Sequence, residues 1–387
     1  MGEWKNVRVG ELGKIITGKT PKTSISDNYG GRIPFLTPSD NMSVKYVGKT
    51  SKTLTEKGLL EVKNAILPEN SVCVSCIGSD LGKAVITTCP TVTNQQINSI
   101  IVDEKSFDVS FVYYAMQILG KKMNFISKTS TAVPIVNKSS FSSYEIKCPP
   151  REDQKRIAAV LSALDSKIEC NKKINDNLLW QAQALYKDRF IDLKPFNGRM
   201  PPDWQLGTVS EIIELHDSKR IHLSSRERAN LTKIYPYYGA TSVMDYVDRY
   251  LFDGIYLLLG EDGTVVDDKG FPILQYVEGK FWVNNHAHII TGKNGFTVET
   301  LYLLFSLTNV RSIVTGAVQP KISQANLNNV SVVIPSKAEL STFNSIVQPI
   351  FSQIRNLRAE SDRLTATRDI LLPRLMSGEI DAANIQL

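Results

Sequence analysis

Residues 4–12 (WKNVRVGEL) return 200 positions later as residues 204–212 (WQLGTVSEI). A second match links Pro149-Pro150, and the apolar series after it, to Pro335-Ser336 at an offset of 186. The chain therefore contains two copies of one unit, of which the second has shorter loops. A duplicated unit predicts two-fold pseudosymmetry and contact with a partner at two places.

The length and composition of the chain fit a globular protein with two domains. Its 387 residues are 42% hydrophobic and 22% charged, enough to bury two ordinary cores. The N-terminal residues form no apolar signal core, and no run of 18 apolar residues could span a bilayer. Five cysteines, an odd number with uneven spacing, fit a reducing compartment better than a disulfide framework. We therefore expect a cytoplasmic protein without membrane contact.

Charge is distributed unevenly between the two copies. The whole chain has a formal net charge of +6, which favours an anionic partner. Residues 1–150 carry a net charge of +6, residues 151–200 carry +3, residues 201–335 carry −3 and residues 336–387 carry 0. The two copies thus share an architecture but present different surfaces, and they should face different parts of a common partner.

Each copy consists of a β-rich region with one internal helix, followed by a long helix. Short β-rich runs are predicted at residues 71–77, 84–88, 254–260 and 279–283, and internal helices near residues 109–119 and 298–307. The predicted fold class is α+β, with two β-rich mixed domains separated by two long antiparallel coiled-coil helices in a pseudo-two-fold arrangement. The predicted segments are a first domain (1–150), a helix (151–192), a second domain (193–335), a second helix (336–378) and a C-terminal tail (379–387).

The two long helices carry the strongest periodic pattern. Positions alternating four and three residues apart, like the a and d positions of a coiled coil, are Ile157, Leu161, Leu164, Ile168, Asn171, Asn175, Leu178, Ala182 and Leu185. Adding 186 gives the matching series Phe343, Val347, Ile350, Ile354, Leu357, Ser361, Leu364, Arg368 and Leu371. Each helix could instead pack on its own domain, but two matching seams favour pairing. Equivalent starting points predict an antiparallel pair, and helices of about 34 residues would hold the domains about 50 Å apart.

One motif has the form of a nucleotide-binding loop. Residues 13–20 (GKIITGKT) match the phosphate-cradling pattern G-x-x-x-x-G-K-[ST]. That chemistry requires a buried strand before the loop and a helix that opens at the Lys-Thr pair. The residues that follow have the composition of a loop, and the second copy lacks the motif. We therefore expect no nucleotide site, and we interpret the segment as a loop that contacts DNA phosphates.

The remaining candidates for metal binding or catalysis are incomplete. Cys73 and Cys76 lack a second pair of ligands, and residues three apart in a strand point to opposite faces, so we expect buried structural cysteines. His286 and His288 share a strand face without a third ligand nearby, and residues 267–268 are interpreted as an acidic loop. No G-x-S-x-G motif is present. We expect no metal site and no catalytic residue.

Several stretches together resemble the specificity subunit of type I restriction-modification enzymes. Residues 148–157 (CPPREDQKRI) match the entry to that family's central helical region, and residues 371–380 (LLPRLMSGEI) resemble the end of its distal one. Residues 334–339 (IPSKAE) are a weaker copy of the entry, with Leu340 in place of the Gln. Further matches within the two domains are residues 93–98 (TNQQIN), 283–288 (VNNHAH), 236–240 (PYYGA) and 259–263 (LGEDG). The resemblance covers nearly the whole chain.

The resemblance implies a role in DNA recognition. Each domain would be a target-recognition domain that reads one half of a bipartite, asymmetric sequence in double-stranded DNA. The helices would set the spacing and dock two methyltransferase subunits, which carry S-adenosylmethionine, through the surroundings of the seam residues. Two restriction subunits, which use ATP and Mg²⁺, would complete the enzyme. The chain has neither an Asn-Pro-Pro-aromatic motif nor helicase motifs, so we expect a non-catalytic subunit without a cofactor of its own.

Candidate DNA contacts are polar residues in loops at equivalent positions of the two copies. Carboxylates belong among them because they can accept a hydrogen bond from cytosine N4. The candidates are Lys19, Thr20, Lys22, Arg32, Ser79, Gln95 and Gln96 in the first domain, and Lys219, Arg220, Tyr238, Glu261, Asp262, Asn284 and His286 in the second. The acidic second domain would take its phosphate contacts from local clusters such as Lys219-Arg220, Arg226 and Arg228.

Each candidate also has a structural interpretation. Gln95, Gln96, Asn284 and His286 could instead satisfy hydrogen bonds inside the domain, Tyr238 could pack, and the charged residues could simply be solvated. The sequence leaves two other functions open. One is a stand-alone bivalent adaptor for DNA or protein, and the other is a nucleotide hydrolase built on residues 13–20.

Overall fold

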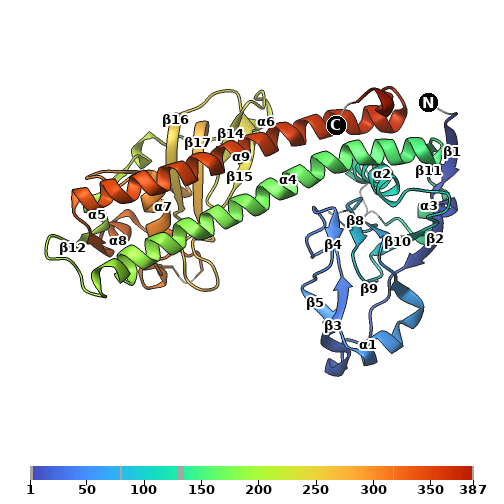
Figure 1. The fold of residues 1–387 in the computed structure, drawn as a ribbon, viewed down its shortest axis with the longest axis horizontal. Helices are drawn as coiled ribbons and strands as arrows, with labels where there is room; N and C mark the ends of the chain where they lie inside the picture. The colour runs from blue at the N-terminus through green and yellow to red at the C-terminus, as the bar shows by residue number, and fades with distance from the viewer. Residues whose placement is uncertain (1–2, 79–80, 129–134, 317, 386–387) are drawn as a thin grey trace. The chain divides into compact units, whose positions relative to one another are not determined.

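The computed structural model describes residues 3–78, 81–128, 135–316 and 318–385. Its internal contacts divide the chain into two compact units (Figure 1). Unit 1 consists of Met1–Cys170 and Ser361–Leu387, and unit 2 of Asn171–Glu360. Both long helices cross this division, so each unit is a β-rich globule together with one half of each helix. The α+β class with two β-rich domains and two long helices is confirmed.

The described residues of unit 1 form eleven strands and three short or medium helices before the first long helix begins. They are β1 (Lys5–Arg8), β2 (Gly13–Thr17), β3 (Tyr29–Leu36), β4 (Tyr46–Val47), β5 (Lys52–Leu54), α1 (Glu56–Glu61), β6 (Ile66–Leu67), β7 (Ser71–Ser75), β8 (Ala84–Thr87), β9 (Thr91–Thr93), β10 (Ile97–Val102), α2 (Val109–Lys128), α3 (Lys138–Ser143), β11 (Glu145–Cys148) and α4 (Arg151–Tyr186).

The strands of unit 1 form a central sheet of order β2-β10-β7-β8-β4, a second sheet of order β5-β3-β9-β6, and the pair β1-β11. Strand β7 is buried along its whole length. Because successive side chains of a strand point to opposite faces, Val72 and Val74 join the core under α2, whereas Cys73 joins a smaller core on the other face. Cys73 and Cys76 are buried on opposite sides, so the prediction that they are buried is confirmed.

The main core of unit 1 lies between the central sheet, α2 and the long helices (Figure 1). Phe111 and Met116 of α2 are fully buried against β7 and β8. Ile157 and Leu161 of α4 close this core together with Leu375 of the second long helix. The helix halves in unit 1 therefore pack on their own globule as well as on each other.

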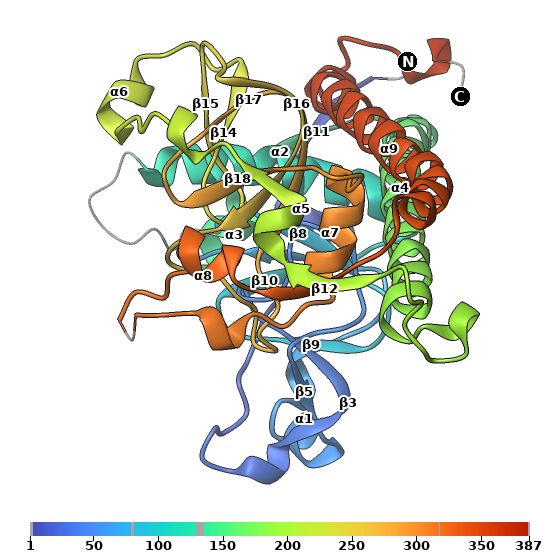
Figure 2. The ribbon, with the colours of Figure 1, turned by 90° about the vertical axis from the view of Figure 1, so that its left-hand side faces the viewer.

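Unit 2 repeats this plan with fewer strands. Its elements are β12 (Gln205–Thr208), α5 (Val209–Ile212), β13 (Ile213–Leu215), α6 (Ser225–Ala229), β14 (Tyr235–Tyr238), β15 (Val243–Val247), β16 (Phe252–Gly260), β17 (Leu274–Val283), β18 (Ala287–Gly292), α7 (Val298–Ser306), α8 (Gln324–Asn328), β19 (Ser331–Ile334) and α9 (Lys337–Ser377). Six strands form one sheet of order β13-β18-β16-β17-β14-β15, and α7 packs against β16, β17 and β18 (Figure 2).

The two units repeat each other down to the register of a strand pair. In unit 1, β1 and β11 are antiparallel with Lys5 opposite Cys148. In unit 2, β12 and β19 are antiparallel with Gln205 opposite Ile334. These residues differ by the same offsets, 200 and 186, that relate the repeated sequence stretches. The repeat in the sequence is therefore a repeat of the fold.

Helices α4 and α9, of 36 and 41 residues, run antiparallel in both units. Arg368 contacts Asp165 at 3.0 Å in unit 1, and Asn171 contacts Glu360 at 2.8 Å in unit 2. The seam residues fall into two groups by exposure. Ile157, Leu161, Phe343, Val347 and Ile354 are almost fully buried, and Leu164, Ile168, Leu178, Ile350, Leu364 and Leu371 are half-buried.

The seam shifts by one residue at the end of α4. Leu185 is 42% exposed, whereas Tyr186 is 7% exposed and packs against Phe190 and Phe343. An α-helix of 3.6 residues per turn drifts from a strict 3.5-residue repeat, and α4 continues into a wider π-helical turn at Lys187–Ile191. Both effects turn Tyr186 inward in place of Leu185.

Gln154 shows why the entry to α4 differs from the entry to α9. It is 2% exposed, its side-chain oxygen accepts a hydrogen bond from the backbone N–H of Asp108 (2.9 Å), and its amide donates to the carbonyl of Pro149 (3.0 Å). These bonds tie the start of α4 to the start of α2. In unit 2, Leu340 is equally buried and packs in an apolar core instead.

A polar cluster joins the globule of unit 1 to the long helices. The ammonium of Lys45 donates to Ser162 on α4 (2.7 Å) and to the Tyr114 hydroxyl (3.3 Å), and it lies over the Tyr114 ring. Tyr114 in turn donates to Asp165 (2.5 Å), which also accepts from Arg368 of α9 (3.0 Å). Burial lowers the pKa of Lys45 to about 8, although the charge of Asp165 opposes this shift.

Replacing Lys45 by Met should remove a pH dependence of stability. Between pH 8 and about 10.4, the ordinary pKa of a lysine, the unfolded chain binds more protons at this residue than the folded chain does. The free energy of unfolding of the wild type should therefore rise with pH in this range, by about 1–2 kcal/mol after allowing for partial exposure. Denaturant titrations of the wild type and of Lys45→Met at pH 7.5 and 9.5 test this. Equal pH responses of the two proteins would contradict the assignment.

Candidate nucleic-acid interface

Three loops of unit 1 meet at one edge of the central sheet. Thr17 at the end of β2 lies opposite Asn98, Ser75 at the end of β7 lies opposite Ile97, and Ala84 begins β8. Because neighbouring strands alternate in direction, the loop after β2, the turn before β10 and the loop between β7 and β8 come together. We call this the loop edge of unit 1. It carries most of the predicted DNA contacts of the first domain.

Direct hydrogen bonds join these loops. The Thr20 hydroxyl donates to the side-chain oxygen of Gln95 (2.6 Å), and the carbonyl of Gln96 accepts from the backbone of Cys76 (2.8 Å). Lys19 and Gln95 are exposed there. The structure thus brings together Lys19, Thr20, Gln95 and Gln96, which lie about 75 positions apart in the sequence.

Two further predicted contacts lie away from the loop edge. The backbone N–H of Lys22 donates to Glu61 of α1 (2.9 Å). Lys22 therefore lies beside α1 and not at the loop edge. Arg32 is on β3 of the second sheet, where its exposed guanidinium contacts Glu56 of α1 (3.1 Å). Ser79 lies outside the described residues.

Residues 13–20 do not form a phosphate cradle. Gly13–Thr17 is strand β2, which pairs with β10, so its backbone amides take part in the sheet and do not surround a phosphate. No α-helix opens at Lys19-Thr20; the next helical turn is the short 3₁₀ turn Ser26–Asn28. A P-loop needs both features, so the nucleotide-hydrolase interpretation has no structural basis.

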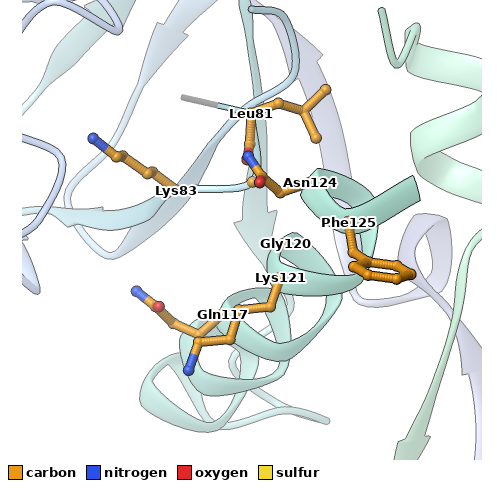
Figure 3. Close-up of a pocket in the computed structure, with 8 residues that line it drawn as sticks. Leu81, Lys83, Gln117, Gly120, Lys121, Asn124 and Phe125 are labelled. Carbon is orange, nitrogen blue, oxygen red and sulfur yellow. The ribbon is translucent and has the colours of Figure 1, made fainter. Parts of the chain in front are cut away.

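A pocket of about 440 Å³ adjoins the loop edge of unit 1 and was not anticipated from the sequence (Figure 3). Leu81, Gly82 and Lys83 come from the loop after β7, and the rest of the lining comes from one face of α2: Gln117, Gly120, Lys121, Asn124 and Phe125. The backbones of Gly82 and Gly120 touch, so a Cβ at Gly120 would stand 1.9 Å from the carbonyl oxygen of Gly82. In the sequence, Gly120 is the residue that could have indicated this contact, because glycine in a helix interior often marks close packing.

Unit 2 has an equivalent loop edge. Leu215 at the end of β13 lies opposite Ile290, and Gly260 at the end of β16 lies opposite Ala287. The loops after β13 and β16 and the turn before β18 therefore meet, as their counterparts do in unit 1. Tyr238, at the end of β14 beside Val283, belongs to the same edge, where its half-buried ring packs edge-on against Phe281.

Ion pairs occupy the centre of this second edge. The guanidinium of Arg220 contacts Glu261 and Asp217, and Lys321 contacts Glu261 at 3.3 Å. The side chains of Arg220 and Glu261 are 14% and 12% exposed. Two residues predicted to contact DNA therefore bind each other, and the exposed Lys219 beside them is more accessible.

Asp217, Glu261 and His288 have ligand atoms within 4.8 Å of one another. The fully buried His288 faces the Asp217 carboxylate with Nδ1 (2.6 Å) and the Ile322 carbonyl with Nε2 (2.8 Å). Burial alone would raise the pKa of Asp217, but hydrogen bonds and the charge of His288 hold it below its usual value. Each ring nitrogen of His288 thus already has a partner within the protein. Arg220 already supplies positive charge, and the cluster is best described as an ion-pair network.

His286 and Asp262 form a second pair at the rim of this edge. The Nδ1 atom of His286 contacts the Asp262 carboxylate, and the His286 side chain is 38% exposed. Asn284 is 1% exposed, and its side-chain oxygen accepts from the backbone of His286 (2.8 Å), so it shapes the turn from inside. Arg228 is also internal, bound to Asp245 (3.0 Å), whereas Arg226 is exposed.

The chain matches a known family twice. The model described as "Type I restriction modification DNA specificity domain" matches residues 1–179 and again residues 201–366. The chain therefore belongs to this family and carries two specificity domains. The family accounts for the repeated fold, since each match covers one globule and most of the long helix that follows it.

Individual relatives agree with this assignment. The chain is 26% identical to the type I restriction enzyme MjaIX specificity subunit of Methanocaldococcus jannaschii, in an alignment that covers 98% of this chain and 94% of that protein. It is 32% identical over 180 residues to the type I restriction enzyme HindI specificity subunit of Haemophilus influenzae, covering 45% of this chain and 39% of that protein. The fold is similar to the crystal structure of the type I restriction-modification S subunit from M. genitalium, with a TM-score of 0.55, 18% identity, and 97% and 96% of the two chains covered.

The relatives are specificity subunits. Among the described residues, no helix has an apolar stretch long enough to cross a membrane.

Proposed function

We propose that this specificity subunit reads a bipartite, asymmetric DNA target, with one half-site bound at the loop edge of each unit. The observation that carries the proposal is the equivalent loop edge in two domains that each match a DNA specificity family. A target with two halves is the natural ligand of a chain with two such edges. The chain itself is non-catalytic in this proposal and needs no cofactor.

The difference between the two edges supports an asymmetric target. The edge of unit 1 presents the exposed side chains of Lys19 and Gln95 in a part of the chain with net charge +6. The edge of unit 2 holds Arg220 in an ion pair, in a part of the chain with net charge −3. A protein selects a base when its hydrogen-bond donors and acceptors match those of the base. Two loop edges with different side chains therefore select two different half-site sequences.

The long helices fit the role of spacer and docking surface. Helix α4 passes without a break from one unit into the other, and its 36 residues correspond to about 54 Å at ~1.5 Å per residue. Large apolar side chains remain exposed on both helices, among them Trp180 (66%) and Ile370 (61%). Exposed apolar residues of this kind support docking of two methyltransferase subunits, which would carry S-adenosylmethionine. Two restriction subunits with ATP and Mg²⁺ would complete the complex.

The proposal is tested by deleting the gene and mapping methylated adenines in the host genome. One bipartite motif with two different halves should lose methylation in the deletion strain and regain it when the gene is restored. A tagged copy of the chain should co-purify with a methyltransferase. Methylation that is unchanged by the deletion, with no methyltransferase bound, would contradict the proposal and favour a stand-alone adaptor.

A further inference from the structure

The turn in the middle of each loop edge is built in the same way in both units. In unit 1 it joins β9 to β10, and in unit 2 it joins β17 to β18. The side-chain oxygen of Asn94 accepts a hydrogen bond from the backbone N–H of Gln96 (3.1 Å). The side-chain oxygen of Asn284 accepts from the backbone N–H of His286 (2.8 Å). Each turn is therefore shaped by an asparagine at its first position.

The backbone anchors of the two turns are equivalent too. On one side, the N–H of the asparagine donates to the last residue of β3 in unit 1 (3.1 Å) and to the last residue of β14 in unit 2 (3.0 Å). On the other side, the carbonyl of Gln96 accepts from Cys76 (2.8 Å), and the carbonyl of His286 accepts from Glu261 (2.8 Å). Both turns are thus held between the same neighbouring segments of the fold.

The second and third residues of each turn carry polar side chains that are exposed or half-buried. The oxygen of Gln95 accepts from Thr20, and the oxygen of Gln96 accepts from the Asn94 amide (2.9 Å). These bonds turn the oxygen of each amide toward a protein donor, so the NH₂ group of each glutamine can donate to a partner. In unit 2, the exposed Asn285 carries an amide of the same kind, and the neighbouring His286 contacts Asp262 through Nδ1.

The surroundings of the two turns differ, although the turns themselves do not. Thr20 and the exposed Lys19 adjoin the turn of unit 1, and the Arg220–Glu261 ion pair adjoins the turn of unit 2. Two half-sites of different sequence share their sugar-phosphate backbone, and contacts to that backbone position a protein without specifying sequence. The turn is common to both units, and the sugar-phosphate backbone is common to both half-sites. We therefore expect the turn to contact that backbone.

We propose that these turns are DNA-backbone clamps. The side chains of Gln95 and Gln96 in unit 1, and of Asn285 in unit 2, donate to phosphate oxygens and set the register of each domain on the duplex. The loops around the turns then select the bases. This inference rests on the proposed function, because it assumes that the loop edges face DNA.

Two variants test the clamps, the double variant Gln95→Ala with Gln96→Ala and the single variant Asn285→Ala. Each is measured in the full chain, in complex with its methyltransferase partner. The Kd for a duplex with the complete target and for a duplex with the corresponding half-site scrambled should rise by a similar factor, about tenfold. The methylated motif should keep its sequence. Because amides release no counterions, the salt dependence of Kd for the glutamine variant should keep its slope.

The control is Gln205→Ala, which removes an exposed amide from β12 in the other sheet of unit 2 and should leave both Kd values unchanged. The single variant Gln95→Ala, at an exposed side chain, gives the same test if the double variant misfolds. A methylated motif altered at one base, or unchanged affinity for both duplexes, would overturn the clamp. A wild-type complex without any sequence preference would instead overturn the proposed function.

Discussion

Excision of one heptad from each long helix, residues 167–173 together with residues 359–365, is expected to shorten the spacer of the DNA target and leave both half-sites unchanged. Seven residues of α-helix are about 10 Å long, the length of about three base pairs. The number of unspecified base pairs should therefore fall by at most about three. Removal of a whole heptad keeps the remaining a and d positions in phase, so the shortened helices can still pair.

The pairing of α4 with α9 determines where this excision falls. Asp165 lies against Arg368 in unit 1, and Asn171 lies against Glu360 in unit 2, so the two excised segments are opposite each other. The contacts of Ser162 with Lys45 and of Arg355 with Tyr276, which join helices to globules, are kept.

Sequencing of methylated DNA from cells that carry the shortened chain measures both the half-sites and the spacer. Lys172→Ala with Asp362→Ala is the matched control, since it changes exposed residues of the same segments and keeps their length. An altered half-site with a constant spacer would contradict the role of the helices.

Replacement of Asp217 by Ala is expected to destabilise unit 2 by about 3–5 kcal/mol, the cost of leaving buried charges without their partner. Asp217 is 7% exposed and accepts hydrogen bonds from His288 (2.6 Å), from the backbone of Ile289 (2.8 Å) and from Gln324 (2.6 Å). Its loss would leave the buried His288 without its hydrogen-bond partner and would weaken the hold on the sheet edge between β13 and β18.

Hydrogen exchange locates this effect within the chain. Amide protection of β18 (Ala287–Gly292) should fall in the Asp217→Ala protein, whereas protection of β10 (Ile97–Val102) in unit 1 should stay. The control is Asp203→Ala, at an exposed carboxylate, which should change neither strand. Unchanged protection of β18 would show that the ion-pair network does not hold this edge. If the loop edge of unit 2 unfolds in the Asp217→Ala protein, methylation of the bipartite target should be lost as well.

Most of the fold was predictable because its signals are local or repeated. The a and d spacing of the long helices, the two internal helices and the offsets of 200 and 186 all reappear in the structure. The departure at Leu185 has a local cause, since Tyr186 turns inward where α4 widens. The division at residues 170 and 360 was not predictable, because the contacts that bind each helix half to a globule are long-range.

The sequence predicted which loops form the candidate site. It did not predict which of their side chains are free to contact DNA. The strands of both central sheets bring the predicted loops to one edge, and equivalent stretches of sequence occupy equivalent turns. The ion pairing of Arg220 with Glu261 was hidden, because 41 positions separate the two residues. The pocket beside Gly82 and Gly120 was hidden for the same reason.

The sequence by itself determined that the chain holds two copies of one fold, each followed by a heptad helix, because repeats and periodicity are properties of neighbouring residues. The tertiary structure decided which polar residues are used up inside each copy and which remain for DNA. Strand order and register set the distances between side chains, and at a few ångströms those distances decide whether a charge is neutralised within the protein or offered to a partner.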